Sequence, residues 1–293
     1  TLSSSSAASD VYKRQRQRRR RYTFHALTAG QSAAQRPDSE SSGCSQWLVD
    51  IAGLGPLLAV GPDSLRTGHC MPRRPRPGCA DLVFHVMNRA VSKLTLFDSR
   101  SDYVAFERVL CEAAERFPMR LLCYALMPNH WHLVLWPIGD DDLSRYMQWV
   151  TMTHAQRWHL ARASTGAGAV YQGRFKAVPV QCDRNFLTLC TYVERNPVEA
   201  KLVARAEEWP WSSASAVHPA VGGPPTHPWP VERPADWAER VNRPLPRRSA
   251  EAVRRCIRQG VPFGQQTWRV QTALRLGWSS ALRPRGRPAK ILR

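Results

Sequence analysis

The sequence predicts an α+β protein whose central domain has a ferredoxin-like antiparallel sheet, with helices on one face and one added helix. Short runs of apolar and branched residues, typical of strands, alternate with segments of helical periodicity. The order is strand, helix, strand, strand, helix, strand, helix, which is the split arrangement of ferredoxin-like folds. The hydrophobic fraction of 43% is enough to fill a core.

The first half of this domain is predicted to contain a strand, a helix and a hairpin of two strands. Asp98 or Ser99 can cap the helix, and Pro118 stops it. Pro128 and Asn129 supply the turn of the hairpin. The expected ranges are 82–88 for the first strand, 99–117 for the helix, and 119–126 and 131–136 for the hairpin strands.

The second half adds a helix, a strand and the extra helix. Acidic residues at 140–142 favour the start of the first of these helices, and residues 175–181 form the fourth strand-like run. Asp183 can cap the extra helix, which is expected to end at Asn196 and Pro197. The helix after residue 142 should bury Leu143, Tyr146, Met147, Val150, His154 and Trp158.

Composition divides the rest of the chain. Residues 1–70 are rich in Ser, Ala and Arg without periodicity, so we expect a disordered or non-native upstream segment ahead of a domain at 71–217. A Pro-rich connector is expected at 218–248, with tryptophans that pack against the domain. Residues 249–293 predict a basic, helical, DNA-binding tail, in which two short helices are spaced as in a helix-turn-helix.

The net charge and the cysteine pattern limit the classes of binding partner and the cellular location that we expect. The 42 Lys and Arg residues against 23 Asp and Glu give a net charge of +19, which attracts polyanions and makes nucleic acid the first partner to consider. No apolar run approaches the ~20 residues of a spanning helix, so no membrane partner is expected. The eight cysteines form no Cys-x-x-Cys pair, which argues against a zinc ribbon and favours a reducing, cytoplasmic location.

Two pairs of residues are candidates for a metal-binding or catalytic role. His130 and His132 lie on a strand-like segment, where alternation points both imidazoles to one face and Trp131 to the other. Two neighbouring imidazoles make half of a divalent-metal site, although a lone His-x-His is more often ordinary polar surface. Tyr192 and Asn196 are four residues apart on a predicted helix and so face the same way, although most helical tyrosines are merely packed.

Together with two further motifs, these residues resemble a known family. The order and spacing of the four motifs resemble the HUH single-tyrosine transposases of insertion-sequence type, and in particular the REP-associated tyrosine transposases of bacteria. The resemblance covers about residues 71–217. The motifs are Phe84–Arg89 (FHVMNR), Ala125–Leu133 (ALMPNHWHL), Tyr171–Phe175 (YQGRF) and Tyr192–Pro197 (YVERNP).

This resemblance implies an enzyme that nicks single-stranded or hairpin DNA and transfers strands through a 5′-phosphotyrosine intermediate during DNA transposition. Tyr192 matches the family's nucleophile. His130 and His132 match its metal-binding histidines, and Asn196 stands where family members place a third, amide ligand for Mg²⁺ or Mn²⁺.

Alternatives remain open for both roles. Glu194 and His85 are the other candidates for the third ligand, although Glu194 should point away from Tyr192 and His85 is better explained as structural. Tyr171 is the competing nucleophile, but it lies in a loop before a strand. Two other functions also stay open, namely a repeat-binding protein or regulator that does not cut DNA, and a metal phosphoesterase that uses water.

Basic residues on either side of these motifs are the expected DNA contacts. Arginine and lysine neutralise phosphates, and an extended Arg-Gly-Arg segment can enter a narrow minor groove. The sequence leaves the choice between a monomer and a homodimer open. The predicted DNA-binding residues are Arg73, Arg74, Arg76, Arg174, Lys176, Arg285 and Arg287.

Overall fold

The computed structural model describes residues 79–92, 94–216 and 223–278, all within one compact unit, Cys70–Arg293. The upstream segment expected at 1–70 lies outside these residues. So do five of the predicted DNA contacts, Arg73, Arg74, Arg76, Arg285 and Arg287.

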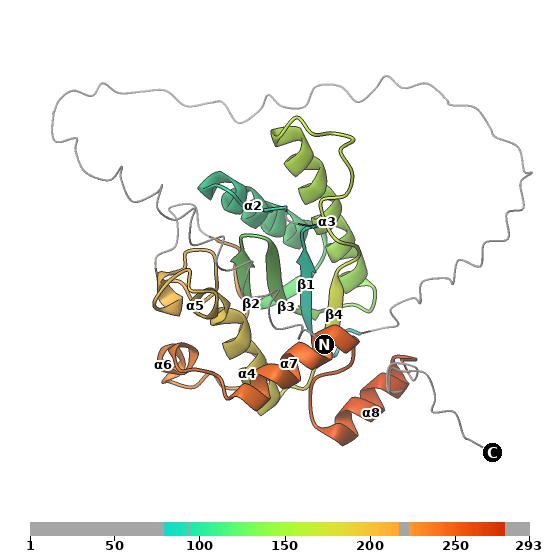
Figure 1. The fold of residues 1–293 in the computed structure, drawn as a ribbon. Coiled ribbons are helices and arrows are strands. Elements are labelled where there is room, and N and C mark those ends of the chain that lie inside the picture. Colours follow the sequence, from blue (N-terminus) through green and yellow to red (C-terminus); the bar gives the residue numbers. More distant parts are fainter. Residues whose placement is uncertain (1–78, 93, 217–222, 279–293) are drawn as a thin grey trace, which may run out of the picture. The chain divides into compact units, whose positions relative to one another are not determined.

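A four-stranded antiparallel sheet forms the centre of the described unit (Figure 1). Its strand order is β2-β3-β1-β4, in which each neighbouring pair is antiparallel. This is the ferredoxin-like order, so the predicted fold class is confirmed. The strands are β1 (Val83–Arg89), β2 (Met119–Met127), β3 (His130–Pro137) and β4 (Lys176–Val180).

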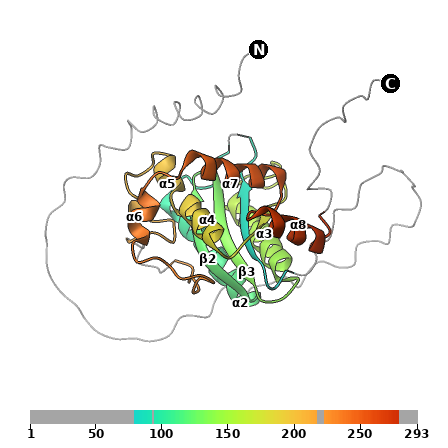
Figure 2. The same ribbon diagram turned by 90° about the horizontal axis from the view of Figure 1, so that it is seen from below.

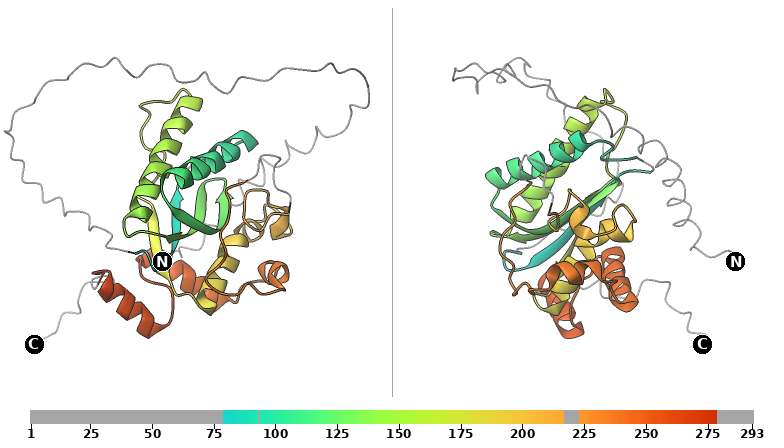
Figure 3. Two further views of the ribbon diagram at one scale, coloured as in Figure 1. Left: turned by 180° about the vertical axis from the view of Figure 1, so that it is seen from behind. Right: turned by 90° about the vertical axis from the view of Figure 1, so that its left-hand side faces the viewer.

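Helices α2 (Arg100–Arg116) and α3 (Asp142–Ala161) cover one face of the sheet (Figure 3). Ser99 caps α2 in a reciprocal capping box with Asp102, as the local sequence predicts. The buried side chains of α3 are those that the helical spacing predicts, and they pack with α2 and the sheet into one apolar core. The helices α2 and α3 therefore stabilise the sheet from one face, and the histidines described below lie on its opposite face.

The opposite face is covered by α4 (Arg184–Glu194) and α7 (Arg247–Gln259), which lie across the sheet in Figure 2. Asp183 caps α4 through its side chain, as predicted. The end of this helix differs from the prediction, because α4 stops at Glu194 and a short helix, α5 (Asn196–Glu199), begins there. Pro197 stands in the first turn of α5, where its missing N–H costs nothing.

The segment expected to be a Pro-rich connector is built into the unit. It contains α6 (Trp237–Asn242), which packs against α4, and Trp237 is buried. The Trp229 indole N–H donates to the Leu122 carbonyl on β2 at 2.9 Å. The tryptophans therefore pack against the domain as expected. The remaining elements are a 3-10 turn at Ala206–Glu208 and α8 (Gln266–Arg275).

No helix in the described part of the chain combines the length and apolar character that crossing a membrane requires.

Candidate active site

Three histidines lie on the sheet face that α4 covers. In the antiparallel register His132 pairs with Met87, His130 pairs with Arg89, and His85 pairs with Val134. Directly paired residues share a face, so all three imidazoles stand on the same side of β1 and β3. The intervening residue, Trp131, points into the core on the other side. The sheet register therefore places the imidazoles of His130 and His132 side by side on one face of the sheet, with His85 on the neighbouring strand.

The Nδ1 atoms of both β3 histidines are engaged. His132 Nδ1 lies 2.9 Å from His85 Nε2, and His130 Nδ1 donates to the Asn129 side-chain oxygen at 2.7 Å. Since an amide oxygen only accepts, His130 carries its proton on Nδ1 and has its lone pair on Nε2. The two rings are 5.0 Å apart between centroids. This is how metal-binding histidines are usually oriented, by a hydrogen bond from the ring nitrogen that does not coordinate.

These imidazoles are neutral. Burial lowers the pKa of His85 to about 3, while burial and the nearby Arg89 charge lower the pKa of His130 to about 4. Burial, followed by the two neighbouring histidines, holds the pKa of His132 well below its usual value. The neutral imidazole is the form that can donate a lone pair to a cation.

Tyr192 projects from α4 toward this surface. Its ring centroid is 6.0 Å from that of His132, with the two rings nearly perpendicular. One turn later, the Asn196 side-chain N–H donates to the Tyr192 carbonyl at 3.0 Å. The structure thus brings the Tyr192 ring against His132, and Asn196 lies one helical turn after Tyr192.

The side chains present fit a divalent cation if one ligand is an amide. No group of three His, Cys, Asp or Glu side chains in the described ranges is arranged to hold a metal. His85 Nε2 is already turned to His132, and both Glu194 oxygens are occupied, by Ser213 and Trp237. The His130 and His132 Nε2 atoms and the Asn196 oxygen are the candidate donors that remain, and their chemistry, mixed nitrogen and oxygen, suits Mn²⁺ or Mg²⁺.

Tyr171 lies on the other side of the sheet. Its hydroxyl accepts from the Trp131 indole N–H at 3.2 Å and lies 2.7 Å from His154 Nδ1. Burial raises its pKa above the ordinary value for a tyrosine. Tyr171 is thus a buried structural residue, and the β-sheet separates it from the histidine pair.

Two exposed cations, Lys176 and Arg89, lie on the histidine face. Arg174 and Lys176 are exposed, and Lys176 shares the histidine face through its pairing with Met87. The sequence reasoning missed Arg89, which is exposed and pairs directly with His130. The available signal was its alternation with His85 and Met87 along one strand.

A family model matches the part of the chain that carries this site. Residues 79–196 match the family model described as IS200-like transposases, a range that includes the four strands, the histidines, Tyr192 and Asn196. This part of the chain is therefore similar to IS200-like transposases, in agreement with the resemblance carried by the four motifs.

The solved structures that are similar to the chain include that of a REP-associated tyrosine transposase bound to a REP hairpin. The identity is 18%, over 48% of this chain and 80% of that chain, with a TM-score of 0.40. The comparison with curated proteins gives no match.

Proposed function

We propose that this transposase cuts and rejoins single-stranded or hairpin DNA through a 5′-phosphotyrosine intermediate. The observation that carries the proposal is the contact of the Tyr192 ring with His132, 6.0 Å between centroids, on a face with neutral imidazoles and exposed cations. A phenol, a potential metal site and positive charge are the components that attack on a phosphodiester requires.

In the proposed reaction the Tyr192 oxygen attacks phosphorus, a P–O bond to tyrosine forms, and the bond from phosphorus to the 3′ oxygen breaks. The phenolic proton passes to water, and the departing 3′ oxygen takes one up. His130, His132 and Asn196 would hold Mg²⁺ or Mn²⁺, which when bound stabilises negative charge on the phosphate oxygens. Because the covalent link preserves the phosphoester energy, another 3′-hydroxyl can reverse the step without a nucleotide cofactor.

DNA binding in this proposal has three parts. Arg89, Arg174 and Lys176 contact phosphates beside the site, since surface cations near a phosphodiester neutralise its charge. The catalytic domain is residues 71–217. Residues 249–293 form the DNA-binding tail, in which Arg285 and Arg287 reach the minor groove, while Arg73, Arg74 and Arg76 precede the domain.

A denaturing gel tests this function. Wild-type protein, Mn²⁺ and a labelled hairpin DNA from the flanks of its own gene should yield a slow-migrating covalent adduct that Tyr192→Phe abolishes. Tyr171→Phe is the matched control, because it removes a tyrosine hydroxyl on the opposite face and should retain the adduct. Cleavage without an adduct would indicate a phosphoesterase that uses water, and binding without cleavage would indicate a repeat-binding protein.

A further inference from the structure

A long groove runs between α3 and the segment 165–175, on the other side of the molecule's core from α4. Its volume is about 1090 Å³. One wall is a single stripe of α3, because residues three or four apart share a helix face. The α3 side chains of this wall are Ser144, Gln148, Thr151, Met152, Ala155, Gln156, His159 and Leu160.

The lining combines apolar contact area with polar side chains and positive charge. Met152 and Leu160 are 53% and 77% exposed, so both present apolar side-chain area to the groove. Gln148 and Gln156 offer amides, Arg174 offers a cation, and no Asp or Glu lines the groove. Apolar contact area, amide donors and acceptors, and a cation without acidic neighbours can contact the base faces, base edges and phosphates of unpaired nucleotides.

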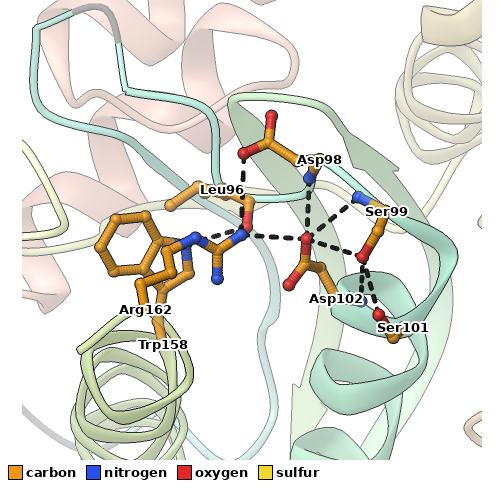
Figure 4. A network of polar contacts seen from close by, with 7 residues as sticks. All are labelled: Leu96, Asp98, Ser99, Ser101, Asp102, Trp158 and Arg162. Atoms are coloured by element: carbon orange, nitrogen blue, oxygen red, sulfur yellow. Dashed lines mark hydrogen bonds and ion pairs between the residues drawn. The ribbon is translucent and has the colours of Figure 1, made fainter. Parts of the chain in front are cut away.

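Both walls are held in place. The far side of α3 is tied to the start of α2, where Arg162 donates to Asp102 at 2.9 Å and the Trp158 indole N–H donates to the Leu96 carbonyl at 3.1 Å (Figure 4). The opposite wall is tied to β1, because the Asn88 amide donates to the Gly173 carbonyl at 3.1 Å. The groove is therefore pre-formed, which lowers the entropy cost of binding.

The groove adjoins the candidate active site at one end. The Gln172 N–H donates to the Arg89 carbonyl at 2.9 Å, so the wall segment continues the sheet beyond β1. Arg89 in turn pairs with His130. Arg174, which lines the groove, therefore lies two positions along the chain from Gln172, which is bonded to the residue that pairs with His130.

We propose that this groove binds unpaired nucleotides of the DNA strand whose phosphodiester is presented to Tyr192. Met152 and Leu160 contact base faces, the glutamine amides contact base edges, and Arg174 contacts a phosphate. This proposal rests on the proposed function, since it concerns the same DNA strand.

Binding is measured in the Tyr192→Phe protein without metal, so that cleavage does not enter the result. The probe is a labelled oligothymidylate of about 20 nucleotides, followed by fluorescence anisotropy. The double variant Met152→Ala, Leu160→Ala should raise its Kd about tenfold, or ~1.4 kcal/mol, with an unchanged salt dependence. Arg174→Ala should weaken binding and reduce the salt slope by about one.

The control is Ile138→Ala, which removes a side chain of similar exposure, 54%, outside the groove and outside the proposed DNA-binding tail. It should bind as the parent protein does. The proposal is wrong if the groove double variant binds as tightly as the control, or if the parent does not bind the strand. It is also wrong if the groove variant keeps its affinity and instead dissociates a dimer in sedimentation, since a second copy then covers the groove.

The adduct assay keeps the two proposals separable. Groove-dependent binding without any adduct from wild-type protein would refute the phosphotyrosine reaction and leave the groove proposal standing. Adduct formation, together with groove variants that bind as the parent does, would support the phosphotyrosine reaction and refute the groove proposal.

Discussion

His85 and His132 form a buried hydrogen bond that orients one candidate metal ligand. His85 Nε2 lies 2.9 Å from His132 Nδ1, and the rings are stacked with centroids 5.0 Å apart. When His132 offers its Nε2 lone pair to a cation, its Nδ1 carries the proton and donates to His85. The His85 proton then stands on Nδ1, a buried atom without a hydrogen-bond partner in the described part of the chain. A buried donor without a partner lowers the free energy of unfolding by about 1 to 3 kcal/mol. The protein therefore gives up some stability to hold His132 in a defined orientation.

Replacing His85 should therefore weaken metal binding. His85→Leu is expected to raise the Kd for Mn²⁺ by about tenfold to a hundredfold, the usual effect of losing such an orienting partner. Isothermal titration calorimetry on the DNA-free protein measures it. His85→Gln should restore part of the affinity, because its side-chain oxygen can accept from His132. His154→Gln, at another buried histidine, serves as the control, and Mn²⁺ binding by His85→Leu at the wild-type level would refute the orienting role.

Glu194 anchors the Tyr192 helix to the C-terminal segment. The carboxylate is 1% exposed and accepts from the Ser213 hydroxyl at 2.6 Å and the Trp237 indole at 2.7 Å. Burial raises its pKa, although these two hydrogen bonds act in the opposite direction. Trp237→Phe removes one donor and keeps the ring, so it should cost about 1 to 3 kcal/mol in the free energy of unfolding.

Trp136→Phe is the matched control for this substitution, because the Trp136 indole nitrogen is buried without a partner among the described residues. Trp136→Phe should change the free energy of unfolding only slightly. Urea unfolding of the two variants measures both free energies. Equal losses for both would mean that ring packing, and not the bond to Glu194, holds the C-terminal segment against α4.

Glu107 should make stability depend on pH. Burial raises the pKa of this carboxyl to about 7 from 4.5, although the Tyr124 hydroxyl donates to it at 3.0 Å. The folded state binds the proton more tightly than the unfolded state, so this stabilisation is complete below pH 4.5 and is lost as pH rises through 7. Wild-type stability should fall by about 1 to 3 kcal/mol from pH 5 to pH 8 through this group.

Thermal unfolding of Glu107→Gln tests this expectation. The variant should match wild type at pH 5 and exceed it at pH 8, since glutamine keeps the acceptor without the charge. Glu115→Gln, on the exposed side of the same helix, should change neither value. A variant that is less stable than wild type at pH 8 would show that the charged carboxylate is stabilising.

The elements and their order could be predicted because their signals are local. The α3 periodicity named the side chains that the helix buries, and the Ser99 and Asp183 caps marked two helix starts. The predicted end of the helix at Asn196 and Pro197 was wrong, because a proline that ends one helix is equally suited to the first turn of the next. The helix at Trp237–Asn242 was missed, since six residues among prolines carry little periodicity.

The contacts around the site could not be read from the sequence, because they join residues that are far apart in the chain. His85 meets His132 across 47 positions through the register of β1 and β3, and Glu194 meets Trp237 across 43 positions. The alternation that pairs His130 with His132 is local and was predicted. The partners that orient these groups depend on tertiary packing, which spacing alone does not encode.

The most direct test of the central claim is mass spectrometry of the covalent adduct after nuclease and trypsin digestion. Cleavage after Arg184 and Arg195 releases Tyr192 in the peptide Asn185–Arg195, while Tyr171 falls in Ala163–Arg174. The account predicts a nucleotide mass on Asn185–Arg195, localised to Tyr192 by fragmentation. A nucleotide on Ala163–Arg174, or cleaved DNA with no modified peptide, would contradict it.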